Sequence, residues 1–274
     1  MSQRILFESH SHTPLCNHAE GDPTEYAAVA FERGLRGLIV TCHNPMPNRF
    51  SHHVRMREDQ FEEYVDLVAR TGEEWAGRVD VRLGLEADYF EGCEAYLEKQ
   101  LASADFQFVL GSVHPQIAEF RTRYWQPDEI EVQRTYFKLL AQSAETGLFD
   151  SLAHPDLIKN VTTKVWSPGA IMDDIRHALD RIAATGVAME LNTSGVNKII
   201  SEMNPFPAML KEMCERNIPV TLGADAHEPD RVADGYETAL HLLDECGFKH
   251  VNFFLDRKRQ QVLIQDALAS LVKR

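Results

Sequence analysis

Short apolar runs alternate with longer amphipathic segments along the whole chain. The apolar runs have the length of buried strands, and the longer segments repeat apolar residues with the period of a helix. The first predicted helix has Asp22 as a plausible N-cap and Pro23 at its first position. The predicted strands cover residues 5–8, 37–41, 80–85, 106–112, 149–153, 188–191, 219–223 and 250–254. The predicted helices cover residues 23–33, 57–75, 91–101, 127–145, 168–185, 206–216, 231–246 and 257–272.

This strand–helix alternation predicts an α/β fold in which helices cover a parallel sheet. Seven or eight such units in 274 residues fit a closed or nearly closed (β/α) barrel better than an open sheet. An open, doubly wound sheet is the alternative, but no Gly-rich phosphate loop follows the first predicted strand. Because no long linker interrupts the alternation, we expect a single domain over residues 1–274.

Histidines and carboxylates gather where the predicted strands end. Seven of the 12 histidines lie just past the carboxyl end of a predicted strand. In a parallel barrel these ends share one rim, which carries the active site, so residues far apart in sequence should converge there. Imidazole and carboxylate bind divalent ions such as Zn, Mn and Fe, and nine candidates suit two or three ions better than one. The predicted metal ligands are His10, His12, His18, His43, Glu86, His114, His154, Asp225 and His227.

Other polar residues near the strand ends are expected to have different roles. Glu190 could face the pocket, where orienting a ligand is its expected role. Cys16 and Cys42 lie near the site, but in a histidine-rich rim we expect neither to bind metal. Three acidic residues should orient a ligand or cap a turn: Glu20, Asp88 and Asp156. The remaining histidines are interpreted as solvent or packing residues: His52, His53, His177, His241 and His250.

Composition narrows the classes of partner. The formal net charge of -14 disfavours attraction to nucleic acid or to an anionic membrane surface. No apolar run approaches the roughly 20 residues of a membrane span, and the residues before the first apolar run are too few for a signal peptide. Five widely spaced cysteines without a C-x-x-C pair indicate reduced thiols. We therefore expect a cytoplasmic protein with a small-molecule substrate, and the sequence makes no prediction of its oligomeric state.

The ordered motifs of this chain resemble those of the PHP (polymerase and histidinol phosphatase) superfamily. The opening motif runs from His10 to Gly21 and has His18 where many members have Asp, in a form similar to the histidinol-phosphate phosphatases of that superfamily. The match covers essentially the whole chain. It continues in order through Thr41-Cys42-His43, Gly84 to Tyr89, Gly111 to His114, Ala153 to Lys159, Glu190 to Gly195 and Asp225-Ala226-His227.

The resemblance implies a distorted (β/α)7 TIM-like barrel of the PHP type. It also implies a trinuclear Zn, Mn or Fe centre held by the nine residues named above, with Glu86 bridging two ions. The implied activity is hydrolysis of L-histidinol phosphate to L-histidinol and phosphate, late in histidine biosynthesis. Two positions that shape the substrate pocket depart from the family pattern. Pro115 replaces a frequent aromatic residue, and Val196-Asn197-Lys198 stands where the family often carries Arg.

For such a reaction we expect a hydroxide that bridges two ions to attack phosphorus in line with the departing alkoxide, since metal binding can lower the pKa of water to about 7. The predicted catalytic residues are Glu86, Asp225 and His227. Positive charge beside the phosphoryl oxygens would neutralise the charge of the transition state. The residues predicted to bind the substrate are Arg49, Arg55, Arg57, Asn192 and Lys198.

Three other functions fit parts of the pattern. A PHP-type phosphoesterase could act on another small phosphomonoester or on a nucleotide phosphodiester, although the acidic charge and the lack of a basic, aromatic-lined groove disfavour nucleic acid. A metal-dependent amidohydrolase also opens with His-x-His, but it usually needs a bridging carbamylated Lys or its equivalent, and we see no Lys placed for this at a predicted strand end. A non-catalytic metal-binding module usually shows an eroded ligand set, whereas all nine positions are filled here.

Overall fold

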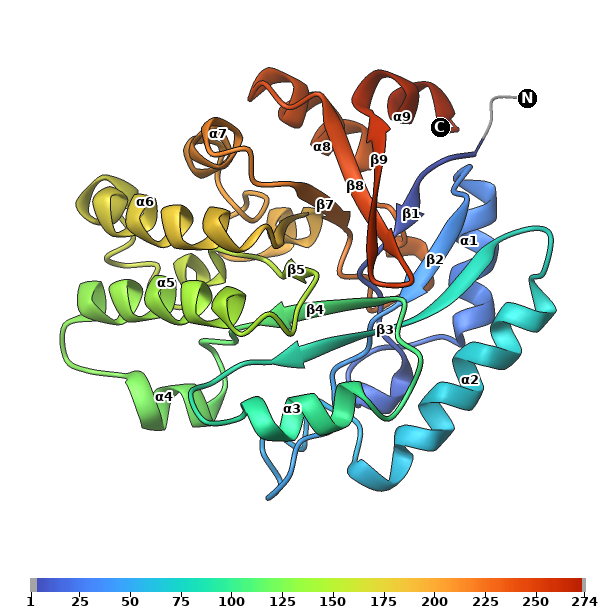
Figure 1. Cartoon of the computed structure of the whole chain (residues 1–274), viewed down its shortest axis with the longest axis horizontal. Coiled ribbons are helices and arrows are strands. Elements are labelled where there is room, and N and C mark those ends of the chain that lie inside the picture. The colour runs from blue at the N-terminus through green and yellow to red at the C-terminus, as the bar shows by residue number, and fades with distance from the viewer. Residues whose placement is uncertain (1–3, 273–274) are drawn as a thin grey trace.

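The computed structural model describes residues 4–272, and within this range nine strands form one sheet in the order of the sequence (Figure 1). Neighbouring strands from β1 to β8 run parallel, and β9 runs antiparallel to β8. The strands are β1 (Phe7–Glu8), β2 (Gly37–Val40), β3 (Asp80–Asp88), β4 (Phe108–Ser112), β5 (Ser151–Leu152), β6 (Ala188–Asn192), β7 (Val220–Gly223), β8 (His250–Leu255) and β9 (Lys258–Leu263). All eight predicted strands are therefore confirmed.

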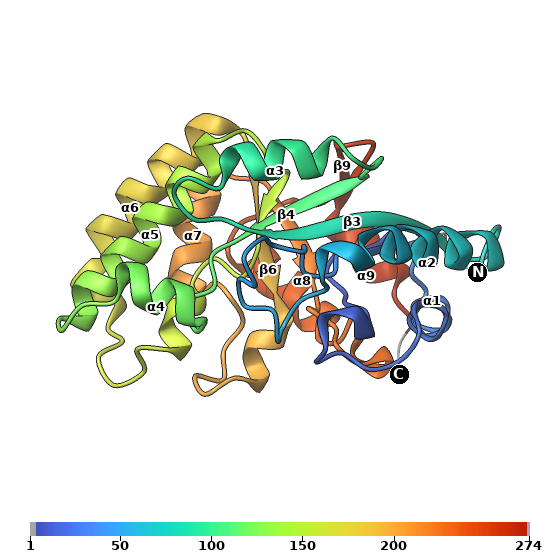
Figure 2. The same cartoon turned by 90° about the horizontal axis from the view of Figure 1, so that it is seen from below.

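Helices connect the successive parallel strands and cover the outside of the sheet; α5 and α6 lie side by side in both views (Figures 1 and 2). A capping box on Asp22 starts the first helix, which satisfies backbone N–H groups that have no partner inside a helix. The α-helices are α1 (Pro23–Glu32), α2 (Phe61–Glu74), α3 (Glu94–Leu101), α4 (Ala118–Tyr124), α5 (Glu129–Glu145), α6 (Pro168–Thr185), α7 (Pro207–Glu215), α8 (Tyr236–Glu245) and α9 (Ile264–Ser270). The 3-10 helices are η1 (Pro14–Cys16), η2 (Glu58–Gln60), η3 (Leu157–Asn160), η4 (Thr193–Asn197) and η5 (Pro229–Arg231).

The sheet closes into a barrel just beyond the C-terminal ends of β1 and β7. A parallel bridge pairs Ser11 with Ala226. The His12 N–H donates to the Ala226 carbonyl at 2.9 Å, and the Ala226 N–H donates to the His10 carbonyl at 3.0 Å. Strands β1 to β7 thus form the ring of a distorted (β/α)7 barrel, as predicted, and β8 joins it through the pairing of Asn252 with Thr221.

The hairpin of β8 and β9 fills the interior of this barrel near the N-terminal strand ends. Phe253 stacks on Phe7 with ring centroids 4.7 Å apart, and Phe254 stacks on Phe108 at 5.3 Å. The turn of the hairpin lies beside the start of β4, where the Arg257 N–H donates to the Gln107 carbonyl at 3.0 Å. Phenylalanines therefore form the base of the barrel interior.

Two predictions about the helices were wrong. Residues 257–272 do not form one helix, because Asp256 and Arg257 have φ values of 50° and 58° and make a tight turn typical of hairpins. The chain reverses there, so Lys258–Leu263 pairs with β8 as a strand and only Ile264–Ser270 is helical. Helix α4, in the loop after β4, was not predicted. No helix in the described part of the chain is long and apolar enough to cross a membrane.

Candidate metal centre

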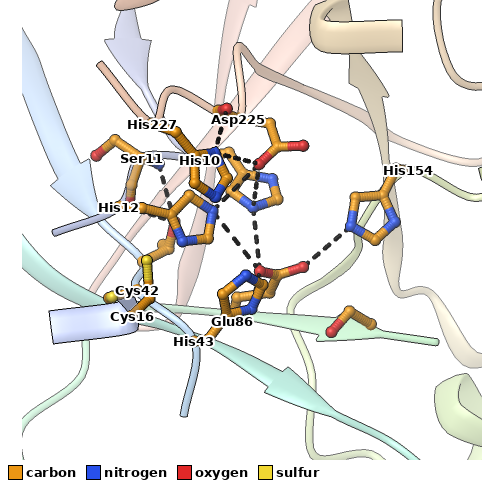
Figure 3. A network of polar contacts seen from close by, with 12 residues as sticks. His10, Ser11, His12, Cys16, Cys42, His43, Glu86, His154, Asp225 and His227 are labelled. Atoms are coloured by element: carbon orange, nitrogen blue, oxygen red, sulfur yellow. Dashed lines mark hydrogen bonds and ion pairs between the residues drawn. The ribbon is translucent and has the colours of Figure 1, made fainter. Parts of the chain in front are cut away.

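The nine predicted ligands converge at the C-terminal ends of the barrel strands, although they span more than 200 positions of sequence. Figure 3 shows His10, His12, His43, Glu86, His154, Asp225 and His227 together. Each comes from a short segment fixed by a neighbouring strand. His43, for example, forms a parallel bridge with Glu86 of β3. His10 and His12 follow β1, His114 follows β4, His154 follows β5, Asp225 and His227 follow β7, and His18 lies beyond η1.

Glu86 lies at the middle of this cluster and is almost fully buried. Its Oε1 lies 3.0 Å from His154 Nε2 and 3.3 Å from His114 Nε2. Its Oε2 lies 2.8 Å from His43 Nδ1, 3.4 Å from His10 Nε2 and 3.7 Å from His12 Nε2. Burial raises the pKa of Glu86, but the surrounding imidazoles outweigh it and hold this pKa well below its usual range. One ionised carboxylate therefore faces five imidazole rings.

Asp225 provides a second carboxylate, which lies on the same Nε2 side of His12 as Glu86. Its Oδ1 lies 3.2 Å from His12 Nε2 and 3.5 Å from His227 Nδ1. Its Oδ2 accepts a hydrogen bond from Ser194 Oγ at 3.0 Å and lies 3.6 Å from Lys198 Nζ. His12 Nε2 thus faces two acidic side chains that could share metal ions with it.

Acceptors outside the cluster fix several of the rings. His10 Nδ1 lies 2.7 Å from Glu190 Oε1, and His114 Nδ1 hydrogen-bonds to Asp88, which also pairs with Arg55. Gly223 makes room for the first of these pairs, because a Cβ atom there would lie 1.9 Å from Glu190 Oε1. Glu190 and Asp88 therefore orient rings of the cluster, as predicted for Glu190 and considered for Asp88.

The centre leaves buried donor and acceptor atoms unpaired. Within residues 4–272 these atoms have no hydrogen-bond partner: His10 Nε2, His12 Nδ1, His43 Nδ1, His154 Nδ1 and Glu86 Oε2. An unpaired buried polar atom costs about 1–3 kcal/mol. His10 Nε2 and His43 Nδ1 have only ion-pair contacts with Glu86 Oε2, at 3.4 and 2.8 Å, so the middle of the cluster has donor atoms available to another ligand. The donors of His43, Glu86 and His114 lie within 4.8 Å of one another, as do those of His10, His12 and Glu86. Imidazole nitrogens with carboxylate oxygens are a donor set for Zn, Mn or Fe, and the cluster fits more than one such ion.

The protonation of the rings differs across the cluster. Burial lowers the pKa of His43 and of His227 to about 3, which leaves both rings neutral and able to bind metal at neutral pH. Burial also disfavours charged His12 and His114, but their carboxylate neighbours raise these pKa values to about 9 and about 10. A metal ion must therefore displace protons from some of its ligands.

A cavity of about 620 Å³ opens over the centre and contains two of the predicted substrate-binding residues, Arg55 and Lys198. Arg55 is buried and engaged with Asp88 and with the Asn44 carbonyl, the latter at 2.9 Å. Asn192 is buried behind the centre and donates to Glu190 Oε2 at 3.0 Å. Arg49 and Arg57 are exposed and lie outside the residues that line the cavity.

Residues without a predicted role also reach the site. Arg121 lines the cavity from α4, and its role could not be predicted because α4 itself was not. His53, interpreted as a solvent or packing residue, lines the same cavity. The sulfur atoms of Cys16 and Cys42 and a ring nitrogen of His12 lie within 4.8 Å of one another. Adjacency to the predicted ligands His18 and His43 was the available signal for the two cysteines.

Comparisons with known proteins agree with this geometry. The model of the PHP domain family matches residues 8–194. The chain is 40% identical over 254 residues to the "Probable histidinol-phosphatase" of Deinococcus radiodurans, which covers 90% of this chain and 96% of that protein. It is 26% identical over 263 residues to the "Histidinol-phosphatase" of Bacillus subtilis, covering 85% of this chain and 97% of the relative.

Solved structures show the same fold. The crystal structure of histidinol phosphate phosphatase from Lactococcus lactis, complexed with Zn, L-histidinol and phosphate, matches with a TM-score of 0.78 at 21% identity. The match covers 95% of this chain and 100% of the other. The ordered motifs, the family model and the 40% identical relative lead to one conclusion. This chain belongs to the PHP domain family.

Proposed function

We propose that this chain is a metal-dependent histidinol-phosphatase, which hydrolyses L-histidinol phosphate to L-histidinol and phosphate. The observation that carries the proposal is the single buried carboxylate, Glu86, with five imidazole rings within 3.7 Å of its oxygens. The 40% identical relative supports the substrate, because its name states this activity and it covers nearly the whole chain. The Lactococcus lactis enzyme, which shares the fold, is complexed with Zn, L-histidinol and phosphate.

In this proposal two or three divalent ions are held by the nine predicted ligands: His10, His12, His18, His43, Glu86, His114, His154, Asp225 and His227. Such ions supply positive charge for the phosphoryl oxygens and lower the pKa of a coordinated water. Glu86 and Asp225 supply the negative charge that keeps the ions together. Asn192 holds Glu190, and Glu190 in turn orients the His10 ring.

Cationic side chains in the cavity would bind the phosphate from the solvent side. Lys198 and Arg121 line the same cavity, and the guanidinium of Arg121 can bind two phosphate oxygens at once. Arg55 has a different role in this proposal, because its charge is already paired with Asp88. It fixes Asp88 and thereby the ring of His114. Direct phosphate binding by Arg49 and Arg57 stays a prediction.

The remaining expectations are part of the same proposal. All five cysteines are free thiols, which supports a cytoplasmic location. We propose a small phosphomonoester as the substrate, with no nucleic acid or membrane partner. A single domain over residues 1–274 stays a prediction.

The test is a comparison of substrates on one metal-quantified preparation. Phosphate release is measured with L-histidinol phosphate, with other small phosphomonoesters, and with p-nitrophenyl phosphate beside its bis-ester. We expect the highest kcat/KM for L-histidinol phosphate and little turnover of the diester. A higher kcat/KM for another monoester would mean that L-histidinol phosphate is not the substrate. Preferred cleavage of the diester would mean that the protein is a phosphodiesterase.

A further inference from the structure

The imidazole rings of the proposed metal centre differ in what holds the nitrogen that points away from the centre. His10 and His114 use the carboxylates of Glu190 and Asp88 for their Nδ1 atoms. His18 and His227 use backbone carbonyls, with Nδ1 lying 2.8 Å from the Cys16 oxygen and 3.0 Å from the Asp225 oxygen. Each of these four rings therefore has an oxygen that can accept its Nδ1 hydrogen. This leaves the other nitrogen free to face the centre.

His12 has no such oxygen, and neither does His154, whose Nδ1 also lacks a hydrogen-bond partner among the described residues. Its Nε2 faces the centre, 3.2 Å from Asp225 Oδ1 and 3.7 Å from Glu86 Oε2. Its Nδ1 is buried and has no hydrogen-bond partner of ordinary geometry among the described residues. The sulfur atoms of Cys16 and Cys42 lie on that side, within 4.8 Å of a His12 ring nitrogen and of each other. Figure 3 shows His12 between this thiol pair and the two carboxylates.

The Cys42 sulfur is itself held in place. Thr13 Oγ1 donates to Cys42 Sγ at 3.2 Å, and Sγ lies 3.7 Å from the Thr13 carbonyl oxygen, to which it can donate. The Cys42 N–H donates to the hydroxyl of Tyr64 at 3.3 Å. The Cys42 and Cys16 side chains are fully buried. A sulfur held by both the hydroxyl and the carbonyl of Thr13 can hold a neighbouring ring at one angle.

We propose that Cys42 is the positioning residue of His12. Its sulfur accepts a hydrogen bond from His12 Nδ1 and keeps Nε2 directed at Glu86 and Asp225. Cys16 packs against Cys42 and limits its movement. This inference rests on the proposed metal centre but does not depend on which phosphate ester the protein hydrolyses.

The test compares Cys42→Ala and Cys42→Ser with Cys214→Ser, a half-buried thiol on α7 away from the centre. Removing a group that orients a metal ligand lowers metal affinity about 10- to 100-fold. Zinc affinity is measured by chelator competition, and the visible spectrum is recorded after substitution with Co²⁺. We expect Cys42→Ala to lose affinity in this range and to shift the cobalt bands. Cys42→Ser should recover most of the affinity, because its hydroxyl also accepts a hydrogen bond, and Cys214→Ser should match the wild type.

Two results would overturn the inference. One is wild-type zinc affinity with an unchanged cobalt spectrum in Cys42→Ala. The other is equal loss in Cys42→Ser and Cys42→Ala at unchanged unfolding midpoints, which would mean that Cys42 only fills space. If the wild-type protein itself binds no ions, the proposed metal centre falls, and this inference falls with it. If the wild type binds them and Cys42→Ala does so equally, only the role of Cys42 is lost.

Discussion

The barrel interior has two halves of opposite chemistry, built from the same strands. At the N-terminal strand ends the rings of Phe7, Phe108 and Phe253 pack together. A few residues further along the same chain segments, His10 follows Phe7 and His114 follows Phe108 into the metal centre. The apolar half excludes water from below, and in such surroundings charges interact more strongly than in water. We therefore expect the half at the N-terminal strand ends to supply stability and the half at the C-terminal strand ends to supply function.

The largest effect should come from removing charge in the half at the C-terminal strand ends. Glu86→Gln keeps the shape of the side chain but removes the charge that faces five imidazoles. Loss of this charge weakens metal binding and the electrostatic stabilisation that depends on it, so we expect metal content to drop and kcat/KM to fall about 1000-fold, equivalent to about 4 kcal/mol. The exposed Glu145→Gln is the matched control. Wild-type turnover by Glu86→Gln with full metal content would show that the charge of Glu86 is not needed for catalysis.

A change among the phenylalanines at the N-terminal strand ends should lower stability and leave activity nearly unchanged. Phe253→Ala removes a buried ring from the stack with Phe7, and such truncations cost about 3 kcal/mol or more. We expect the free energy of unfolding, measured in urea, to fall by about this amount. The kcat of the folded, metal-loaded protein should change little. A large loss of kcat without a loss of stability would remove the functional distinction between the halves.

The smallest expected effect is the release of protons when metal binds to the histidines. Without metal, the pKa values of His12 and His114 are raised to about 9 and about 10. A raised histidine pKa stabilises the folded metal-free protein below the unfolded value of about 6.5, and this contribution is lost as the pH rises through 9 and 10. Metal binding at pH 7 should therefore release protons, and metal affinity should rise with pH. A weakly buffered zinc titration with a pH indicator measures the release, and no release at pH 7 would contradict these assignments.

The convergence of the nine predicted ligands could be predicted from the sequence because one rule of parallel barrels sufficed. Each strand end directs its next residues to the same rim, so His43 and His154 could be placed without knowing any distance. The orienting role of Glu190 followed from its position two residues before Asn192, at the end of the same strand. These predictions depend only on local pattern and topology.

Other features depend on contacts that no local pattern encodes. Lys258–Leu263 is a strand because the turn at Asp256 and Arg257 returns the chain to β8. Arg57 and Arg55 are close in sequence, yet the first is exposed and the second is buried against Asp88. Arg121 enters the cavity from a short helix inside a loop. In each case the long-range partner decides the role of the residue.

Stepwise reconstitution of the metal-free enzyme tests directly whether turnover requires ions bound at the Glu86 cluster. The chelated protein is titrated with zinc or manganese while bound metal and phosphate release from L-histidinol phosphate are measured on the same samples. We expect negligible turnover without metal and a rise in turnover that ends at two or three ions per chain, with fewer ions bound by Glu86→Gln. Full turnover by the metal-free protein, or equal ion binding by Glu86→Gln, would contradict this expectation.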